Sequence, residues 1–294
     1  MCAAITALVA CGHSTGTAPA ATASGKPIVV ATTSTLASLV KTVAGDALDV
    51  HWLVPIGASP ETYEPAPRDL IELSHAAVIV ENGSGLEAWL TKLLADASPQ
   101  ARIVVLSDSL PSQVSHPNGS EFANPHFWLD PQYAASYVRA IADALVAMDP
   151  RHAALYRKNA AAEIKDLAAL DAWTRQQITT IPPSQRAMIA DHDAWFYFDR
   201  RYGIDDVGAI EQSPGKEPSA ADLVSLIARA KAHNVRAIFA EPEFSPKLAK
   251  QLADSAGIKT VTNLYDDSLG TTPDLSSYEG MMHHDVKTIV QALK

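Results

Sequence analysis

A long segment near the middle of the chain constrains the fold more than any other part of the sequence. Residues 151–180 contain no glycine and no proline, and apolar residues recur along one helical face at Ala160, Ile164, Leu167 and Ala168. At about 1.5 Å per residue, the segment predicts one rigid helix of roughly 45 Å, longer than most helices of globular proteins. The Ile181–Pro183 run ends it, because proline cannot continue a helix. The helix therefore divides the chain into two parts.

Short apolar runs alternate with helical stretches on both sides of this helix. The predicted strands before it are Ile28–Thr32, Asp49–Val54, Ala77–Val80 and Arg102–Leu106. Those after it are Ala187–Ala190, Asp206–Ile210, Arg236–Ala240 and Ile258–Asn263. Strands that alternate with helices indicate parallel sheets. The sequence therefore predicts an α/β protein with two Rossmann-like lobes, residues 26–150 and 181–294, each with a central parallel sheet, joined by one long rigid helix at residues 151–180.

The first 25 residues predict an export leader followed by a flexible tether. The apolar run Ala3–Ala10 leads to Cys11 in the string Leu-Val-Ala-Cys-Gly, which resembles a bacterial lipobox in which that cysteine is lipidated. No Lys or Arg precedes the run, and an accidental cysteine in a leader is the alternative. Residues 14–24 are all Ala, Thr, Ser, Gly or Pro, a composition typical of a tether. We expect an extracytoplasmic protein, periplasmic or at the cell surface, that touches the membrane only through a lipid anchor.

Charge and cysteine content exclude several classes of function. The net charge of -10 argues against a nucleic-acid binder, which would need a basic face. Both cysteines, Cys2 and Cys11, lie in the leader, so the body of the chain has no thiolate metal site and no disulfide framework. Any metal ligands there must be nitrogen or oxygen atoms.

Four polar residues stand at the ends of predicted strands, two in each half of the chain: Glu61, His126, His192 and Asp267. In open α/β sheets, ligands collect outside the carboxyl ends of the strands. Each residue alone also fits an ordinary structural role. Glu61 fits a solvated loop acid, and His126 fits a hydrogen-bonded core histidine. His192 fits a helix cap, and Asp267 fits a turn acid, with Asp266 competing for the same role.

The strings around these residues resemble one family. They include Tyr63-Glu64-Pro65-Ala66-Pro67, Pro125-His126-Phe127-Trp128, His192-Asp193-Ala194 and Phe239-Ala240-Glu241-Pro242. They are similar to motifs of the zinc- and manganese-binding receptors of ABC importers, the cluster A-I or ZnuA-like and TroA-like solute-binding proteins. The resemblance implies a monomeric receptor, not an enzyme, that captures one divalent metal ion and delivers it to an ABC transporter permease. It also implies two ligands from each lobe and a small hinge movement, because a stiff helix resists closure.

By this resemblance, the family's four ligand positions fall on Glu61, His126, His192 and Asp267. The family usually has histidine at the first position, and a site of three ligands plus water is the alternative. Two neutral imidazoles and two carboxylates would neutralise a divalent cation and complete zinc's tetrahedron, whereas catalytic zinc keeps one position open. Neighbouring Asp191 and Asp193 are candidates for orienting the second histidine.

The identity of the ion follows less directly from these residue types. Two imidazoles favour Zn²⁺, while two carboxylates also suit Mn²⁺, so zinc is the expected ion and manganese the second choice. An exported zinc metalloenzyme is a competing function, although the sequence contains no H-E-x-x-H motif. A metal-linked surface adhesin or a receptor for an organic solute would also fit a two-lobed exported chain.

Overall fold

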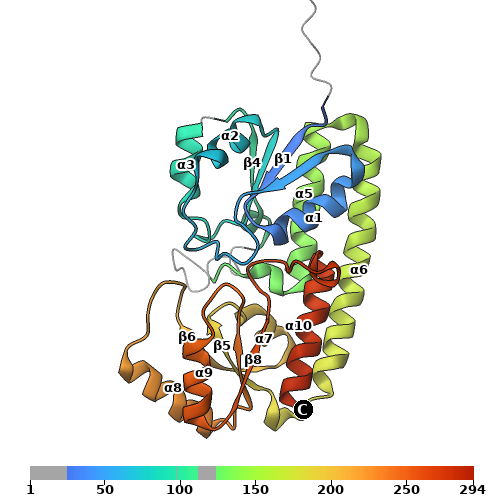
Figure 1. Cartoon of the computed structure of the whole chain (residues 1–294). Helices are drawn as coiled ribbons and strands as arrows, with labels where there is room; N and C mark the ends of the chain where they lie inside the picture. The colour runs from blue at the N-terminus through green and yellow to red at the C-terminus, as the bar shows by residue number, and fades with distance from the viewer. Residues whose placement is uncertain (1–24, 98, 112–123) are drawn as a thin grey trace, which may run out of the picture.

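The computed structural model describes residues 25–97, 99–111 and 124–294, which form two lobes joined by one long helix (Figure 1). The N-terminal lobe contains β1 (Ile28–Ala31), β2 (Asp49–Trp52), β3 (Val78–Glu81) and β4 (Arg102–Val105). The C-terminal lobe contains β5 (Ala187–His192), β6 (Asp205–Glu211), β7 (Ala237–Ala240) and β8 (Lys259–Thr262). The sheet orders are β2-β1-β3-β4 and β6-β5-β7-β8, with all neighbours parallel. The predicted fold class is thereby confirmed.

Helices surround both sheets. In the N-terminal lobe these are α1 (Ser34–Ala44), α2 (Pro67–His75), α3 (Leu90–Ala97) and α5 (Pro131–Met148). In the C-terminal lobe they are α7 (Phe196–Tyr202), α8 (Ala220–Ala232), α9 (Lys247–Ala256) and α10 (Tyr278–Leu293). Local sequence sets where several of them begin. The Thr33 hydroxyl accepts from the backbone of α1, and Asp130 caps α5 with Pro131 at its first position.

The linker helix α6 (Ala153–Thr179) runs alongside both lobes, and α10 lies beside it (Figure 1). Its 27 residues correspond to about 40 Å. Its buried face belongs to one hydrophobic cluster that extends from Val29 of β1 to Leu293 of α10. Because this core is continuous through both lobes, the lobes cannot separate far without exposing apolar surface to water.

One arginine, bound to two aspartates, adds a polar connection between the lobes. Arg201 of α7 binds both carboxylate oxygens of Asp171 on α6 at 2.7 and 2.6 Å. The same guanidinium lies 3.2 Å from Asp130, which caps α5 in the other lobe. A planar guanidinium with only 13% of its side chain exposed is well suited to hold two carboxylates in fixed positions. The C-terminal lobe is therefore bound both to the linker helix and to the N-terminal lobe.

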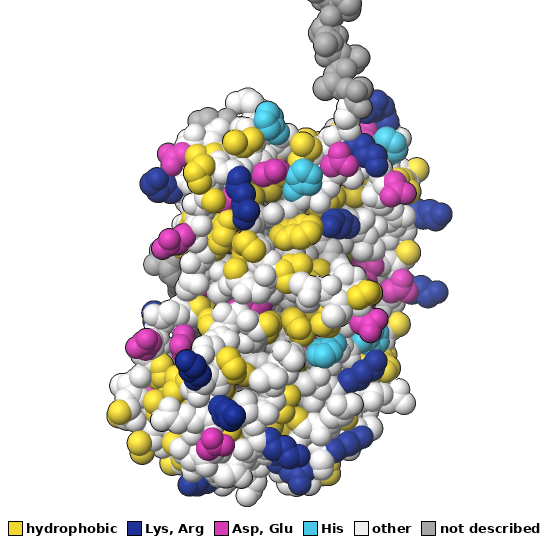
Figure 2. All heavy atoms as spheres, viewed as in Figure 1, with side chains coloured by type: hydrophobic (Ala, Val, Ile, Leu, Met, Phe, Trp, Pro, Cys, Tyr) yellow, Lys and Arg dark blue, Asp and Glu magenta, His cyan; other side chains and the backbone are white. Residues whose placement is uncertain are grey.

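The predicted lipidation residue Cys11 and the predicted tether lie outside the described residues. Within the described ranges, no helix has both the length and the apolar character needed to cross a membrane. On the face shown in Figure 2, acidic and basic side chains are interspersed over both lobes.

Replacing Glu163 by glutamine should stabilise the fold at neutral and alkaline pH. Glu163 of α6 is buried near Glu279 of α10, and burial together with this second carboxyl raises the pKa of Glu163 from 4.5 to about 9. The protonated form therefore contributes stability that is complete below the ordinary pKa and is lost as the pH rises toward 9. Glutamine is neutral throughout, so Glu163→Gln should gain about 1–2 kcal/mol at pH 8.

Urea unfolding of both proteins at several pH values measures this difference. The advantage of the variant should shrink as the pH falls toward about 5, where the unfolded glutamate also becomes protonated. An advantage that stays constant with pH would contradict a protonated Glu163 in the fold.

Candidate metal centre

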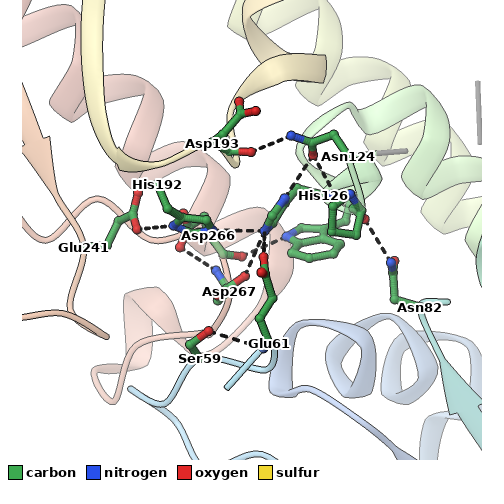
Figure 3. Close-up of polar contacts among 12 residues, drawn as sticks. Ser59, Glu61, Asn82, Asn124, His126, His192, Asp193, Glu241, Asp266 and Asp267 are labelled. Atoms are coloured by element: carbon green, nitrogen blue, oxygen red, sulfur yellow. Dashed lines mark hydrogen bonds and ion pairs between the residues drawn. The ribbon is translucent and has the colours of Figure 1, made fainter. Parts of the chain in front are cut away.

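The four residues singled out from the sequence converge between the two lobes (Figure 3). Glu61 lies in the loop after β2, and His126 immediately precedes the short 3-10 turn Phe127–Leu129. His192 is the last residue of β5, and Asp267 lies in the loop after β8. The two histidines and the aspartate are each 1% exposed, and Glu61 is partly exposed. The structure therefore brings all four candidates together in a largely buried place.

The distances among these side chains match those within one coordination sphere. His126 Nε2 lies 3.1 Å from His192 Nε2, 3.4 Å from Asp267 Oδ1 and 3.6 Å from Glu61 Oε1. Neighbouring ligands on a tetrahedral zinc ion, with bonds of about 2.0–2.1 Å, are separated by about 3.3 Å. The three distances scatter around that value. A single ion could thus contact all four groups after small adjustments of the side chains.

Both imidazoles use Nδ1 to bind a fixed oxygen acceptor, which leaves both Nε2 atoms free. His126 Nδ1 lies 3.0 Å from Asn124 Oδ1, and the amide nitrogen of that asparagine donates to the Asp193 carbonyl. His192 Nδ1 lies 2.6 Å from Glu241 Oε2. These partners assign the proton to Nδ1 in both rings. With the proton on Nδ1 in both rings, two nitrogen lone pairs face each other across 3.1 Å, an approach that is unfavourable unless a proton or a metal ion lies between them.

The electrostatics of the site also favour a cation. Both side-chain oxygens of Asp267 are buried without a hydrogen-bond partner among the described residues. Burial raises the pKa of Glu61 to about 7 and lowers the pKa of His126. Burial also opposes charging of His192, but nearby carboxylates, Asp266 first among them, outweigh it and raise its pKa. Several buried carboxyl groups around the two imidazoles form a donor set that a divalent ion would stabilise.

The two aspartates predicted to orient His192 make hydrogen bonds to the residues that contact the imidazoles, not to the His192 ring itself. Asp191 Oδ2 accepts from the backbone nitrogen of Glu241 at 3.0 Å, and the Asp193 carbonyl accepts from Asn124. Glu241 and Asn124 are the residues whose side chains contact the imidazoles, and sequence reasoning missed both roles. Glu241 stands in the Phe-Ala-Glu-Pro string that carries part of the resemblance, which was the available signal.

The neighbouring acid Asp266 has a different position from Asp267. Its Oδ1 accepts from the backbone nitrogen of Asp267 at 2.7 Å, and its Oδ2 lies 3.6 Å from His192 Nδ1. Its backbone carbonyl accepts from Trp128 Nε1 of the N-terminal lobe at 2.8 Å. Asp267 therefore faces the other candidate ligands, whereas Asp266 lies behind them and fixes the loop.

Comparison with known proteins agrees with this geometry. Residues 29–292 match the family described as zinc-uptake complex component A, periplasmic. The chain is 33% identical over 269 residues to the manganese-binding lipoprotein MntA of Halalkalibacterium halodurans, covering 90% of this chain and 88% of that protein. It is 32% identical over 298 residues to the iron ABC transporter substrate-binding lipoprotein MtsA of Streptococcus pyogenes, covering 97% and 94%. The periplasmic zinc-binding protein TroA from Treponema pallidum superimposes with a TM-score of 0.84 at 28% identity, covering 92% and 99%.

Acidification should weaken metal binding over an unusually high pH range for a carboxylate ligand. Metal binding needs Glu61 ionised and both imidazoles neutral at Nε2, and the pKa of Glu61 is raised by burial to about 7. We expect the apparent affinity for Zn²⁺ to fall by about tenfold or more between pH 7.5 and 5.5. Competition with a chromophoric chelator at each pH measures this change.

Glu61→Gln serves as the matched variant for the same titration. It should bind more weakly at pH 7.5 and should show a shallower pH dependence, because one competing proton has been removed. An affinity that is constant between these pH values in the unmodified chain would exclude this set of ligands.

Proposed function

The chain belongs to the family of the periplasmic zinc-uptake complex component A, and from that premise we propose that it is the extracytoplasmic receptor of an ABC importer. It captures one divalent transition-metal ion between its lobes and delivers it to the permease. The proposed ligands are Glu61, His126, His192 and Asp267. One observation carries the proposal: two buried Nε2 atoms, one from each lobe, lie 3.1 Å apart with both Nδ1 atoms already bonded. A metal ion between the lobes would be bound by both of these nitrogens at once.

The distribution of the ligands favours transport over catalysis. Each lobe contributes one imidazole and one carboxylate, so relative movement of the lobes would break half of the coordination bonds at once. Four protein ligands also complete a tetrahedral sphere, whereas a catalytic zinc ion keeps a position open for water. The relatives named above are described as binding or substrate-binding proteins. A metalloenzyme therefore has less support than a receptor that binds and releases its ion.

Zinc is the favoured cargo and manganese the second candidate. Two imidazoles suit Zn²⁺, and its intrinsic affinity for such a site exceeds that of Mn²⁺. Glu61, however, supplies a second carboxylate, and carboxylate oxygen is the donor that Mn²⁺ prefers. The names of the relatives include manganese, iron and zinc proteins, so this comparison leaves both ions open.

The proposed anchor is Cys11, which lies outside the described residues. Several relatives are described as lipoproteins, in keeping with a cysteine that becomes lipidated at the start of the mature chain. The receptor would act as a monomer, with the permease and the metal ion as its partners.

The unmodified chain is first stripped of metal with a chelator, then exposed to equal concentrations of Zn²⁺ and Mn²⁺, and then freed of unbound metal. It should retain one metal ion. Glu61→Ala and His126→Ala should each lose that ion, because each removes a ligand from a closed sphere. Native mass spectrometry counts the bound ions and distinguishes the two metals. We expect zinc to be retained in preference.

Glu64→Ala and His75→Ala are matched controls, since both side chains are exposed and lie in the same lobe. They remove the same chemical groups and should keep the ion. A folded chain that retains no ion would overturn the metal site and would favour an organic solute instead.

Replacing Glu61 by histidine should increase the preference for zinc. The change would exchange one oxygen donor for a nitrogen donor, which Mn²⁺ tolerates less well than Zn²⁺. We expect the ratio of the Zn²⁺ and Mn²⁺ affinities to rise by about tenfold, equivalent to about 1.4 kcal/mol. Titration with each ion, in competition with a chelator, measures the ratio. An equal ratio in Glu61→His and the unmodified chain would show that residue 61 is not a ligand, and Glu64→His controls for added imidazole.

A further inference from the structure

A buried carboxylate lies against the side of the His192 ring that faces away from the other three candidate ligands (Figure 3). Glu241 directly follows β7, is 2% exposed, and places Oε2 2.6 Å from His192 Nδ1. Nδ1 and Nε2 lie on opposite sides of an imidazole ring. A contact at Nδ1 therefore leaves Nε2 directed toward His126 and Asp267.

The sheet places these two residues side by side. β5 and β7 are parallel neighbours, and Ala190 pairs with Phe239. Two residues further along each strand, the same register brings His192 next to Glu241, with both side chains on the same face. The backbone nitrogen of Glu241 donates to Asp191 Oδ2 at 3.0 Å, which holds its main chain in position. The contact is thus built into the strand pairing and does not depend on a flexible loop.

We propose that Glu241 is a positioning residue for metal binding: its carboxylate fixes the tautomer and orientation of His192 and makes Nε2 a stronger donor. This inference rests on the proposed function. Metal-bound histidines commonly donate their second ring nitrogen to a carboxylate, which raises the basicity of the ligand. His126 lacks such a partner, because its Nδ1 contacts the neutral amide oxygen of Asn124. The two imidazoles are therefore unequal, and the one in the C-terminal lobe is the stronger ligand.

A second metal ion bound beside His192 is the alternative explanation for this arrangement. His192, Glu241 and Asp266 keep potential ligand atoms within 4.8 Å of one another. The distance of 2.6 Å between His192 Nδ1 and Glu241 Oε2 is nevertheless that of a short hydrogen bond. Two ligand atoms on one ion would stay about 3.3 Å apart. A proton, not a second ion, therefore joins these two groups.

Glu241→Gln and Glu241→Ala distinguish the effect of the negative charge of Glu241 from the effect of its hydrogen-bond acceptor. Glutamine keeps an acceptor of the same shape but removes the charge, and alanine removes both. The full chain and each variant are titrated with Zn²⁺ in competition with a chelator, and the cobalt(II) absorption spectrum reports the ligand field. We expect the affinity to fall about tenfold in Glu241→Gln and about 100-fold in Glu241→Ala, with a shifted cobalt spectrum in both.

Glu163→Gln is the matched control, because it neutralises another buried carboxyl that lies on the linker helix beside Glu279 and not among the candidate ligands. It should bind Zn²⁺ like the unmodified chain and leave the cobalt spectrum unchanged. A role for Glu241 in stability alone would lower the melting temperature of the metal-free variants without these changes.

Three outcomes overturn the inference, and each is distinct. Unchanged affinity and spectrum in a folded Glu241→Gln would show that the carboxylate does not influence His192. Two ions in the unmodified chain, with one lost in Glu241→Gln, would make Glu241 a ligand of a second site. Failure of the unmodified chain to bind any ion would overturn the proposed function together with this role.

Discussion

The close approach of two imidazole nitrogens from different lobes is the interaction on which the rest of the arrangement depends. His126 and His192 are buried, and each has its other ring nitrogen bonded to a fixed oxygen. The residues next to the ligands hold this approach in place. Trp128 donates to the carbonyl of Asp266, and its own carbonyl accepts from the Tyr278 hydroxyl. These bonds cross between the lobes close to His126 and Asp267, so they help to set the spacing of the candidate ligands.

Charge is distributed unequally around the site. Besides its two candidate ligands, the C-terminal lobe contributes the buried acids Glu241 and Asp266 and the half-buried Glu243, whose pKa is raised by burial to about 7. The N-terminal lobe contributes Glu61, which is partly exposed. With this glutamate and Asp267 ionised, two carboxylates balance one divalent ion. The proposed carboxylate of Glu241 adds a third negative charge, so the neutral amide of Asn124 suits the histidine of the N-terminal lobe, because a fourth carboxylate would add still more charge that the ion does not balance.

The sequence predicted the architecture and the four convergent residues, but not the partners of the histidines. Alternating strands and helices are local patterns, and the long segment without glycine or proline predicted α6 to within two residues. The prediction of Asp191 and Asp193 rested only on their place next to His192 in the chain. Adjacent residues of a strand point to opposite faces, so Asp191 is directed away from the ring, while Asp193 follows the strand and contacts Asn124 through its backbone carbonyl. Glu241 reaches it from the next strand, 49 residues away, and such a contact depends on sheet order, which local patterns do not reveal.

A stiff connection between the lobes is compatible with release of the ion. One hydrophobic core runs through both lobes along α6, and Arg201 ties three helices together, so wide opening would be costly. Wide opening is not needed, however, because metal–ligand bonds tolerate changes of only about 0.2 Å. A shift of about 1 Å between the lobes would lengthen the bonds of one lobe beyond that range while the other lobe kept its imidazole and carboxylate. On the role proposed for Glu241, the ion would stay with the C-terminal lobe at that stage, held by His192 and Asp267.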